Sequence, residues 1–291
     1  MKKILTTLCS LALIFVSVFG FVGCSNSNTN FTYVALVNNS TGFVTDLDET
    51  SISIGVAKGS SLLEAINNAI SQISEEDRLS LMRAMVDLKK SDENTYTPGE
   101  NAVIIDTDDT FKVAMECGYE PFNWTQPNDA IGAVPISNVA GKYANGYDVQ
   151  IARIVANALG KKLVIIQSEW DPLIPGIKAG TFDAIIAGMS PTAERKEEID
   201  FSNYYFTSNL VVVTKEGSRL ATATTLSEID NAEFRIAAQP GTSHLTLLQS
   251  QTSNCQIIDN LEDFPAMKIA LEAGTIDGYI AEEPTAMALT K

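Results

Sequence analysis

Residues 187–195 hold the side chains and backbone best suited to binding a small anion. Gly188 lets the backbone approach a ligand closely, and the N–H groups after it converge at the start of a predicted helical turn. Arg195 can present a planar, bidentate fork to a carboxylate. The alternative is a surface turn whose arginine pairs with an acid in the segment 197–200, and this segment alone does not decide between the two.

Residues 239–243 repeat the pattern, because a predicted strand at 235–238 runs into Gly241 and then two hydroxyl residues. Thr242 would supply a further donor for the same anion at the start of a helix. Ordinary capping of that helix by Thr242 or Ser243 is the alternative, and it is favoured for this segment taken alone.

Aromatic and acidic side chains follow other predicted strands. Tyr119 and Trp170 are flat side chains at strand ends, the edge at which open α/β sheets bind small ligands. Glu282 ends a predicted strand at 278–281 and can pair with a ligand ammonium group. Core filling by the aromatic residues and a solvated loop charge at Glu282 are the alternatives.

The elements that must position these residues alternate between strands and helices, which predicts an α/β architecture. Ser61 and Glu64 form a capping-box pattern that predicts a helix start.

After residue 208 the elements are too few to cover both faces of a parallel sheet. We therefore expect the N-terminal residues 31–90 to complete that sheet. The predicted strands are residues 51–58, 111–115, 162–166, 182–187, 209–215, 235–238 and 278–281.

Composition limits the classes of partner. The 291 residues carry a formal net charge of −16 and only 20 Lys and Arg, which argues against nucleic acid as a partner. Cysteine spacing matches neither a disulfide scaffold nor a metal site, so we expect no metal and no cofactor. His244 is the single histidine, which argues against a histidine-based hydrolytic triad.

The first 30 residues are typical of an exported lipoprotein. A basic start is followed by an apolar run at 4–21 and by Gly23-Cys24. This pattern predicts a signal peptide over residues 1–23, lipidation of Cys24 and a tether over 24–30. The protein would then lie outside the cytoplasm, anchored to the outer face of the cell membrane or in the periplasm. An uncleaved anchor helix is the alternative, since about 18 apolar residues can span a bilayer.

Together the motifs resemble the polar amino-acid-binding proteins of ABC importers, over most of residues 110–291. The resemblance implies a two-lobed α/β fold of the periplasmic-binding-protein-like type II class. It also implies a monomer without catalysis, which closes on a polar L-amino acid and delivers it to the permease and ATPase of the importer. The motifs are Tyr119-Glu120-Pro121-Phe122, Gly146-Tyr147-Asp148, Trp170-Asp171-Pro172, Phe182-Asp183-Ala184, Gly188-Met189-Ser190-Pro191-Thr192 with Arg195, Asp200-Phe201-Ser202, Pro240-Gly241-Thr242 and Asp277-Gly278-Tyr279.

The resemblance also implies roles for individual residues. Tyr119 and Trp170 would flank the ligand, and Glu282 would pair with its α-ammonium group. Glu116 falls where relatives that bind cationic side chains often place an acid, and with Glu169 it favours a ligand such as Lys or Arg. The residues implied around the α-carboxylate are Gly188, Met189, Ser190, Arg195 and Thr242.

The order of the elements departs from the family. In the family, the elements after the region of Glu282 come last in the chain, whereas here residues 31–90 resemble them. We therefore expect a circular permutation, which requires residues 51–58 to run beside residues 209–215. An unrelated N-terminal domain over residues 31–105 is the alternative.

The permutation sets the expected boundaries. Lobe 1 would comprise residues 59–207, with a bridging linker at 91–109. Lobe 2 would comprise residues 31–58 and 208–291. Hinge strands near 43–58 and 204–214 would join the two lobes.

Two other functions fit the same fold: a small enzyme such as a dehydratase, and a ligand-sensing domain. An enzyme would need an acid or base aimed at the substrate, and Glu116 is the only spare candidate in the sequence. A sensing domain would need a partner that responds to its closure.

Overall fold

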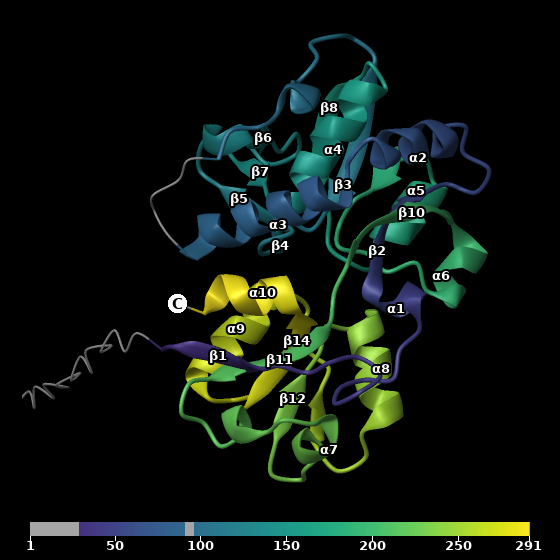
Figure 1. Cartoon of the computed structure of the whole chain (residues 1–291). Coiled ribbons are helices and arrows are strands. Elements are labelled where there is room, and N and C mark those ends of the chain that lie inside the picture. The colour runs from purple at the N-terminus through teal and green to yellow at the C-terminus, as the bar shows by residue number, and fades with distance from the viewer. Residues whose placement is uncertain (1–28, 91–95, 291) are drawn as a thin grey trace, which may run out of the picture.

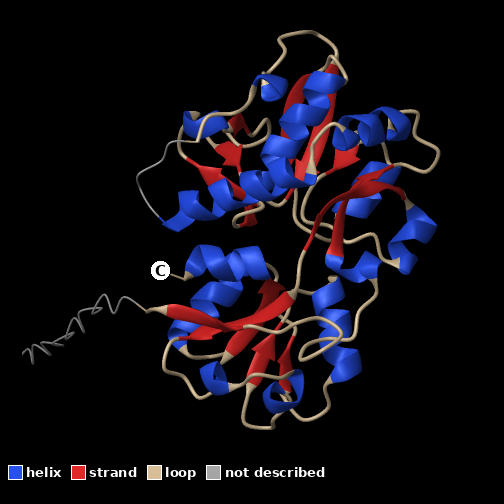
Figure 2. Ribbon diagram, in the orientation of Figure 1, coloured by secondary structure: helices blue, strands red, loops and turns tan. Residues whose placement is uncertain are grey.

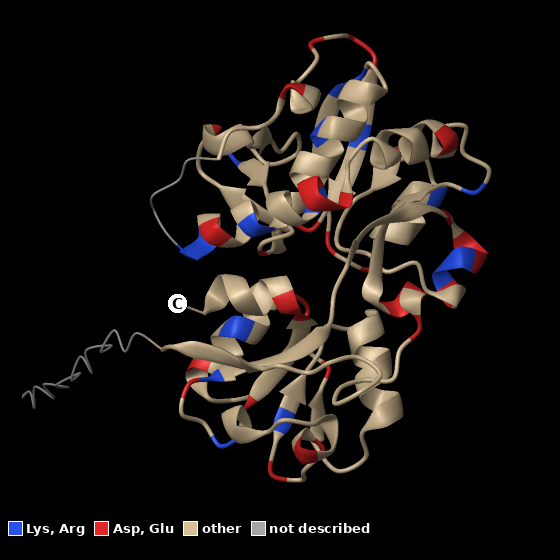
Figure 3. Cartoon of the chain, in the orientation of Figure 1, with Lys and Arg blue, Asp and Glu red and all other residues tan. Residues whose placement is uncertain are grey.

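The computed structural model describes residues 29–90 and 96–290, which form two α/β lobes (Figures 1 and 2). Each lobe is built around a five-stranded sheet that mixes parallel and antiparallel pairs. Acidic residues are spread over both lobes and outnumber the basic ones (Figure 3). The predicted two-lobed α/β architecture is confirmed.

Lobe 1 contains the sheet with strand order β10-β2-β9-β3-β8. Strand β3 runs parallel to β8 and β9, whereas β2 runs antiparallel to β9 and β10. A small four-stranded sheet, β4-β5-β7-β6, lies in the same lobe. The strands are β2 (Ser51–Val56), β3 (Thr110–Met115), β4 (Gly118–Tyr119), β5 (Asn123–Gln126), β6 (Val134–Pro135), β7 (Tyr143–Asn145), β8 (Lys162–Gln167), β9 (Ala184–Ile185) and β10 (Asp200–Thr207).

Helices flank the sheet of lobe 1 on both faces, as the crossovers of a parallel core require (Figure 2). They are α2 (Leu63–Ser71), α3 (Glu75–Lys90), α4 (Tyr147–Ala158), α5 (Leu173–Lys178) and α6 (Ala193–Glu198), with 3-10 turns η1 (Glu100–Ala102) and η2 (Ala130–Gly132).

Lobe 2 contains the sheet with strand order β1-β11-β14-β12-β13. Its elements are β1 (Phe31–Val34), β11 (Leu210–Lys215), η3 (Leu220–Thr222), α7 (Leu226–Ile229), β12 (Arg235–Ala237), α8 (Ser243–Gln251), β13 (Gln256–Ile258), α9 (Phe264–Ala273), β14 (Gly278–Glu282) and α10 (Glu283–Leu289). A short helix, α1 (Leu47–Thr50), lies on the connection between the lobes.

Strand β11 shows why this sheet needs cover on both faces. Val211 and Val213 pack in the core with α9 and α10, whereas Leu210 and Val212 pack in a second core with α7 and α8. An uninterrupted apolar run is typical of a strand that is buried on both sides. The apolar run of β11 therefore predicts a strand that helices cover on both faces of the sheet.

The N-terminal residues complete the second sheet, as predicted, but through a different strand. Strand β1 pairs antiparallel with β11, from Phe31 opposite Lys215 to Val34 opposite Val212. Residues 51–56 instead form β2 in lobe 1, where they pair with β10 and β9.

The predicted pairing of residues 51–58 with residues 209–215 is therefore wrong, as is the assignment of these residues to lobe 2. The physical reason is that β11 already has β1 on one edge and β14 on the other. Every residue of β2 is buried, so this strand needs a position within a sheet, and it lies between β9 and β10.

The chain crosses between the lobes twice, between β1 and β2 and between β10 and β11 (Figure 1). Asn38 joins the two crossings: its N–H donates to Asn209 Oδ1 at 3.2 Å, and its Oδ1 accepts from Leu210 N–H at 3.2 Å. The second crossing lies within the predicted hinge near 204–214. The first crossing covers residues 35–50, so it begins before the predicted hinge at 43–58.

The predicted signal peptide, the lipidation of Cys24 and the alternative anchor helix lie outside the described residues. Within residues 29–90 and 96–290, no helix combines the length and the apolar character needed to cross a membrane.

Candidate ligand-binding site

The predicted anion loop connects β9 to α6. Thr192 caps α6 by accepting the N–H of Arg195 on its side chain. Gly188 has φ +63°, and a Cβ there would lie 3.2 Å from the ring of Tyr119. The loop therefore needs glycine for its left-handed backbone and for the close approach of an aromatic ring.

The second loop connects β12 to α8 in the other lobe. Thr242 caps α8 by accepting the N–H of Leu245. Gly241 has φ +70°, and a Cβ there would lie 3.0 Å from Asp171 Oδ1 and 3.2 Å from the ring of Trp170. Because Asp171 and Trp170 belong to lobe 1, the second loop contacts lobe 1 across the cleft.

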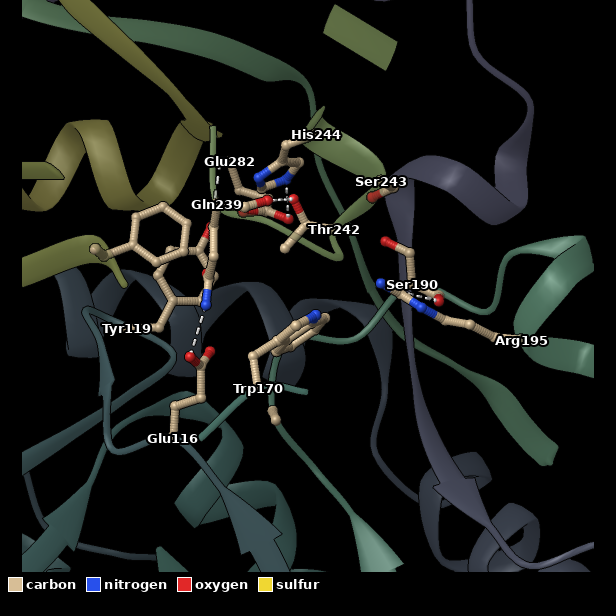
Figure 4. A pocket seen from close by; sticks show the side chains of 13 residues that line it. Glu116, Tyr119, Trp170, Ser190, Arg195, Gln239, Thr242, Ser243, His244 and Glu282 are labelled. Atoms are coloured by element: carbon tan, nitrogen blue, oxygen red, sulfur yellow. Dashed lines mark hydrogen bonds and ion pairs between the residues drawn. The ribbon is translucent and has the colours of Figure 1, made fainter. Parts of the chain in front are cut away.

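Direct hydrogen bonds join the second loop to Trp170 and Arg195 of lobe 1, whose side chains Figure 4 shows beside the pocket. The carbonyl of Gly241 accepts from Trp170 Nε1 at 3.0 Å and from Arg195 Nη2 at 2.9 Å. Arg195 Nη1 donates to the carbonyl of Ser190 at 2.8 Å, and the guanidinium lies 5.2 Å from the centre of the Trp170 ring. The arginine is therefore fixed in orientation by both lobes.

Arg195 is a buried cation, with 8% of its surface exposed. Burial lowers its pKa to about 10, so the guanidinium still carries its charge at neutral pH. None of the carboxylates in the described residues forms an ion pair with it. A buried charge without a counter-ion is costly, so this wall of the pocket favours an anion.

Glu282 lies on another wall, at the end of β14, and is 4% exposed. Its Oε1 lies 3.1 Å from Nε2 of the equally buried His244. Burial raises the pKa of Glu282 to about 8 and, with the charge of Arg195, lowers the pKa of His244 to about 4. No described residue forms a hydrogen bond with Oε2 of Glu282. This side of the pocket therefore favours a ligand group that donates a hydrogen bond to Glu282 Oε2.

Aromatic and amide side chains close the pocket. The Tyr119 ring stacks on Phe264 with centres 3.9 Å apart, and its hydroxyl accepts the N–H of Glu282 at 3.3 Å. Gln239 Nε2 donates to Glu116 Oε1 at 2.7 Å, again from one lobe to the other. The resulting pocket is narrow, with a cavity volume of about 20 Å³.

Eight of the nine predicted ligand-binding residues line this one pocket: Glu116, Tyr119, Trp170, Gly188, Ser190, Arg195, Thr242 and Glu282. Met189 does not line it. Its side chain is 1% exposed and packs in the hydrophobic core instead of facing the pocket. The carbonyl of Met189 accepts from Ser53 N–H in β2.

Five lining residues were not predicted: Ala187, Gln239, Ser243, His244 and Phe264. Gln239 and Ser243 flank the second loop motif, and His244 follows it at the start of α8. Their positions next to a predicted binding loop could therefore have identified them as lining residues. Nothing in the sequence placed Phe264 here, because it comes from α9 and reaches the site only through the packing of lobe 2.

A wider groove continues from the pocket past Glu116 and Trp170. Burial raises the pKa of Glu116 to about 7, with the charges of Asp263 and Asp171 adding to the effect. Four further acids line the groove, and a positively charged group would be favoured along it. They are Glu169, Asp171, Glu262 and Asp263.

The sequence matches the model of one protein family over residues 111–246, the bacterial extracellular solute-binding proteins, family 3. A probable histidine-binding protein from Campylobacter jejuni is 29% identical over 67% of this chain and 68% of its own length.

Two solved structures extend this similarity. The substrate-binding protein of an amino acid ABC transporter is 30% identical, with a TM-score of 0.51 over 62% of this chain and 72% of that one. A Streptococcus pneumoniae amino acid ABC transporter substrate-binding protein bound to L-arginine is 28% identical, with a TM-score of 0.54 over 61% of this chain and 68% of that one. Seven other curated relatives match over 34 to 63% of their own length.

Proposed function

We propose that this chain, which belongs to the bacterial extracellular solute-binding proteins of family 3, captures a free polar L-amino acid between its lobes and presents it to an ABC importer. One observation carries the proposal. A buried guanidinium without a carboxylate partner and a buried carboxyl group with an unpartnered oxygen line the same pocket. An L-amino acid carries an anion and a cation on one carbon, so it complements both walls.

In this scheme the protein binds its ligand without making or breaking a covalent bond. The α-carboxylate would meet Arg195 and the N–H groups around Ser190 and Thr242, and the α-ammonium would meet Glu282. Lobe 1 contributes Arg195 and Ser190, and lobe 2 contributes Thr242 and Glu282. The ligand therefore stabilises the closed arrangement in which the lobes touch. The closed protein is then the form that the permease would recognise.

We propose that the ligand has a cationic side chain. Glu116 lies beside the pocket, and the acidic groove continues outward from it. The relatives are named as histidine-binding and arginine-binding proteins, which fits the same class. The energetic reason is that a carboxylate buried beside other acids is stabilised by a cation.

We further propose that the protein works outside the cytoplasm as a monomer held to the membrane by a lipid on Cys24. The sequence pattern of residues 1–24 supports the export and the anchor.

The strand pairing that the permutation was expected to require is absent, so we propose a circular permutation on a different ground, the pairing of β1 rather than β2 with β11. Helix α10 contacts β1, and Figure 1 shows the end of α10 close to the start of β1. Joining these ends would place β1, β2, α2 and α3 after α10, the order expected for the family. The revised boundary assigns β2 and residues 51–58 to lobe 1, whereas β1 belongs to lobe 2.

A thermal-shift screen of the twenty L-amino acids tests the function, because a ligand at 100 times its Kd stabilises the folded state by about 2.7 kcal/mol. We expect L-arginine, L-lysine or L-histidine to raise the unfolding midpoint most. A response to acidic amino acids alone would contradict the cationic class. No response to any amino acid would contradict the capture function itself.

A further inference from the structure

Four buried side-chain polar atoms in the described residues have no hydrogen-bond partner, and two of them belong to the pair His244 and Glu282. These two atoms are Nδ1 of His244 and Oε2 of Glu282. Both residues line the pocket, are at most 5% exposed, and lie together on the wall that faces Trp170 and Glu116 (Figure 4). Leaving such atoms unpaired costs stability, so their position suggests a ligand group that supplies donors.

The hydrogen bond between the two side chains restricts what Nδ1 can do. If His244 donates from Nε2 to a Glu282 carboxylate, Nδ1 keeps a free lone pair and is an acceptor. If Glu282 is protonated and donates to Nε2 instead, Nδ1 carries the proton and is a donor. The two arrangements differ by one proton and present opposite groups to the pocket.

The surroundings of His244 disfavour its charged form. The residue lies in the first turn of α8, where the helix dipole is positive. The Arg195 guanidinium lies on the same pocket and repels an imidazolium as well. Glu116 is the other titratable acid lining the pocket, and it bonds to Gln239 rather than to the histidine. A neutral imidazole beside the Glu282 carboxylate is therefore the form that suits a cationic ligand group.

We propose that His244 is a ligand-binding residue, whose Nδ1 accepts a hydrogen bond from the same α-ammonium group that Glu282 Oε2 binds. An ammonium group has three donors and no acceptor, so it fits two acceptors that lie on one wall. The inference rests on the proposed capture of an amino acid, and it adds a neutral acceptor to the acidic one. Binding then selects the arrangement in which Glu282 is ionised and His244 carries its proton on Nε2.

The chain offers an unusually direct test, because His244 is its only histidine. Protein purified without a histidine tag and labelled with ¹⁵N-histidine gives one pair of imidazole nitrogen signals. We titrate it at pH 7 with L-arginine, or with whichever amino acid raises the unfolding midpoint most. We expect the bound form to be neutral and protonated on Nε2, with the Nδ1 signal moved in the direction of hydrogen-bond acceptance.

Two substitutions separate the functions of the two ring nitrogens. His244→Gln keeps a donor near the position of Nε2 for Glu282 and removes the Nδ1 acceptor. His244→Asn keeps an acceptor near the position of Nδ1 and removes the Nε2 donor. A hydrogen bond to a charged group contributes about 1.5–3 kcal/mol, so we expect His244→Gln to raise the Kd by about 10- to 100-fold. His244→Asn should retain more of the affinity than His244→Gln, and ligand-free unfolding midpoints establish that both variants are folded.

The outcomes distinguish this inference from the function it rests on. A bound form with the proton on Nδ1, an Nδ1 signal that the ligand leaves unchanged, or a folded His244→Gln with wild-type affinity would overturn the role of His244 and leave amino-acid capture intact. A wild-type protein that binds none of the twenty amino acids would overturn both.

Discussion

Arg195 shows how burial suits a single residue to the proposed binding of an anion. Its protein partners are two backbone carbonyls and the face of Trp170, and none of these neutralises its charge. The guanidinium is therefore desolvated and held in one orientation by these neighbours. Preorganisation of this kind lowers the cost of ordering on binding.

Replacing Arg195 with Ala should weaken ligand binding by about 2–5 kcal/mol, the scale for leaving a buried carboxylate without its partner. Isothermal titration calorimetry measures the change. Lys196→Ala is a matched control, because Lys196 lies on the same helix but pairs with Asp48 at the surface. Unchanged affinity in Arg195→Ala would refute its role in binding the carboxylate.

Ligand affinity should depend on the ionisation of Glu282, whose pKa burial raises to about 8. The ammonium binds the carboxylate, so affinity should rise by up to about tenfold per pH unit between pH 6 and 8, with about one proton released per ligand at the lower end. Calorimetry in two buffers of different ionisation enthalpy measures that proton. The sign is opposite for ligand-free stability: the contribution of Glu282 is largest below pH 4.5, its usual pKa, and is lost as the pH rises through 8.

Glu282→Gln provides the control for this pH dependence. Gln cannot ionise, so the variant should bind weakly and with a flat profile between pH 6 and 8. If the same slope persisted in Glu282→Gln, the proton would have to come from another group, and Glu116 would be the first to examine.

At the scale of elements, two strand-to-helix loops from different lobes form the site. In each loop a glycine with positive φ precedes a threonine that caps the following helix. The capping pattern predicted at Ser61 and Glu64 does not form, because α2 begins at Leu63 without a side-chain cap. A capping box is present instead at Asp46 and Glu49, on the short helix between the lobes.

Gly241→Ala should weaken ligand binding more than it weakens the fold. The new Cβ would press on Asp171 and Trp170 of the opposite lobe, so it would oppose closure. Gly217→Ala is the matched control, because Gly217 also has φ +72° but a Cβ there meets no atom within 4 Å. Both variants should lose about 1 kcal/mol of stability to backbone strain. Equal affinities in the two variants would show that the Gly241 contact does not limit closure.

At the scale of the whole molecule, closure depends on how the two lobes are connected. Two crossings join them, and Asn38 and Asn209 bond one crossing to the other. The core is also continuous across the cleft, where Tyr119 and Phe264 stack. The lobes are therefore joined by a narrow connection, and their facing surfaces contact each other across the cleft.

Reversing the proposed permutation should give a protein that folds and binds the same amino acid. The rearranged chain joins residue 290 to residue 30 by a short linker and opens between Lys90 and Tyr96. Chain ends that lie close together at the surface tolerate such rearrangement. Circular dichroism and the thermal-shift screen compare it with a control opened inside the buried helix α4, which should not fold. Failure of both chains would contradict the proposed relation of chain order to the family.

The sequence by itself determined the chemistry of the site and the class of the fold. The spacing of glycine, hydroxyl residues and arginine after a strand predicted both loops, because these features are local and arise from backbone conformation and capping. Strand β11 was likewise readable from its apolar run.

Only the tertiary structure decided which elements lie beside which. It placed β2 beside β10 rather than β11, since pairing between distant segments depends on which sheet edges are already filled. It also showed that Met189 packs in the core and that His244 and Phe264 line the pocket. Where a side chain lies depends on burial and on packing against other elements, which the sequence does not state directly.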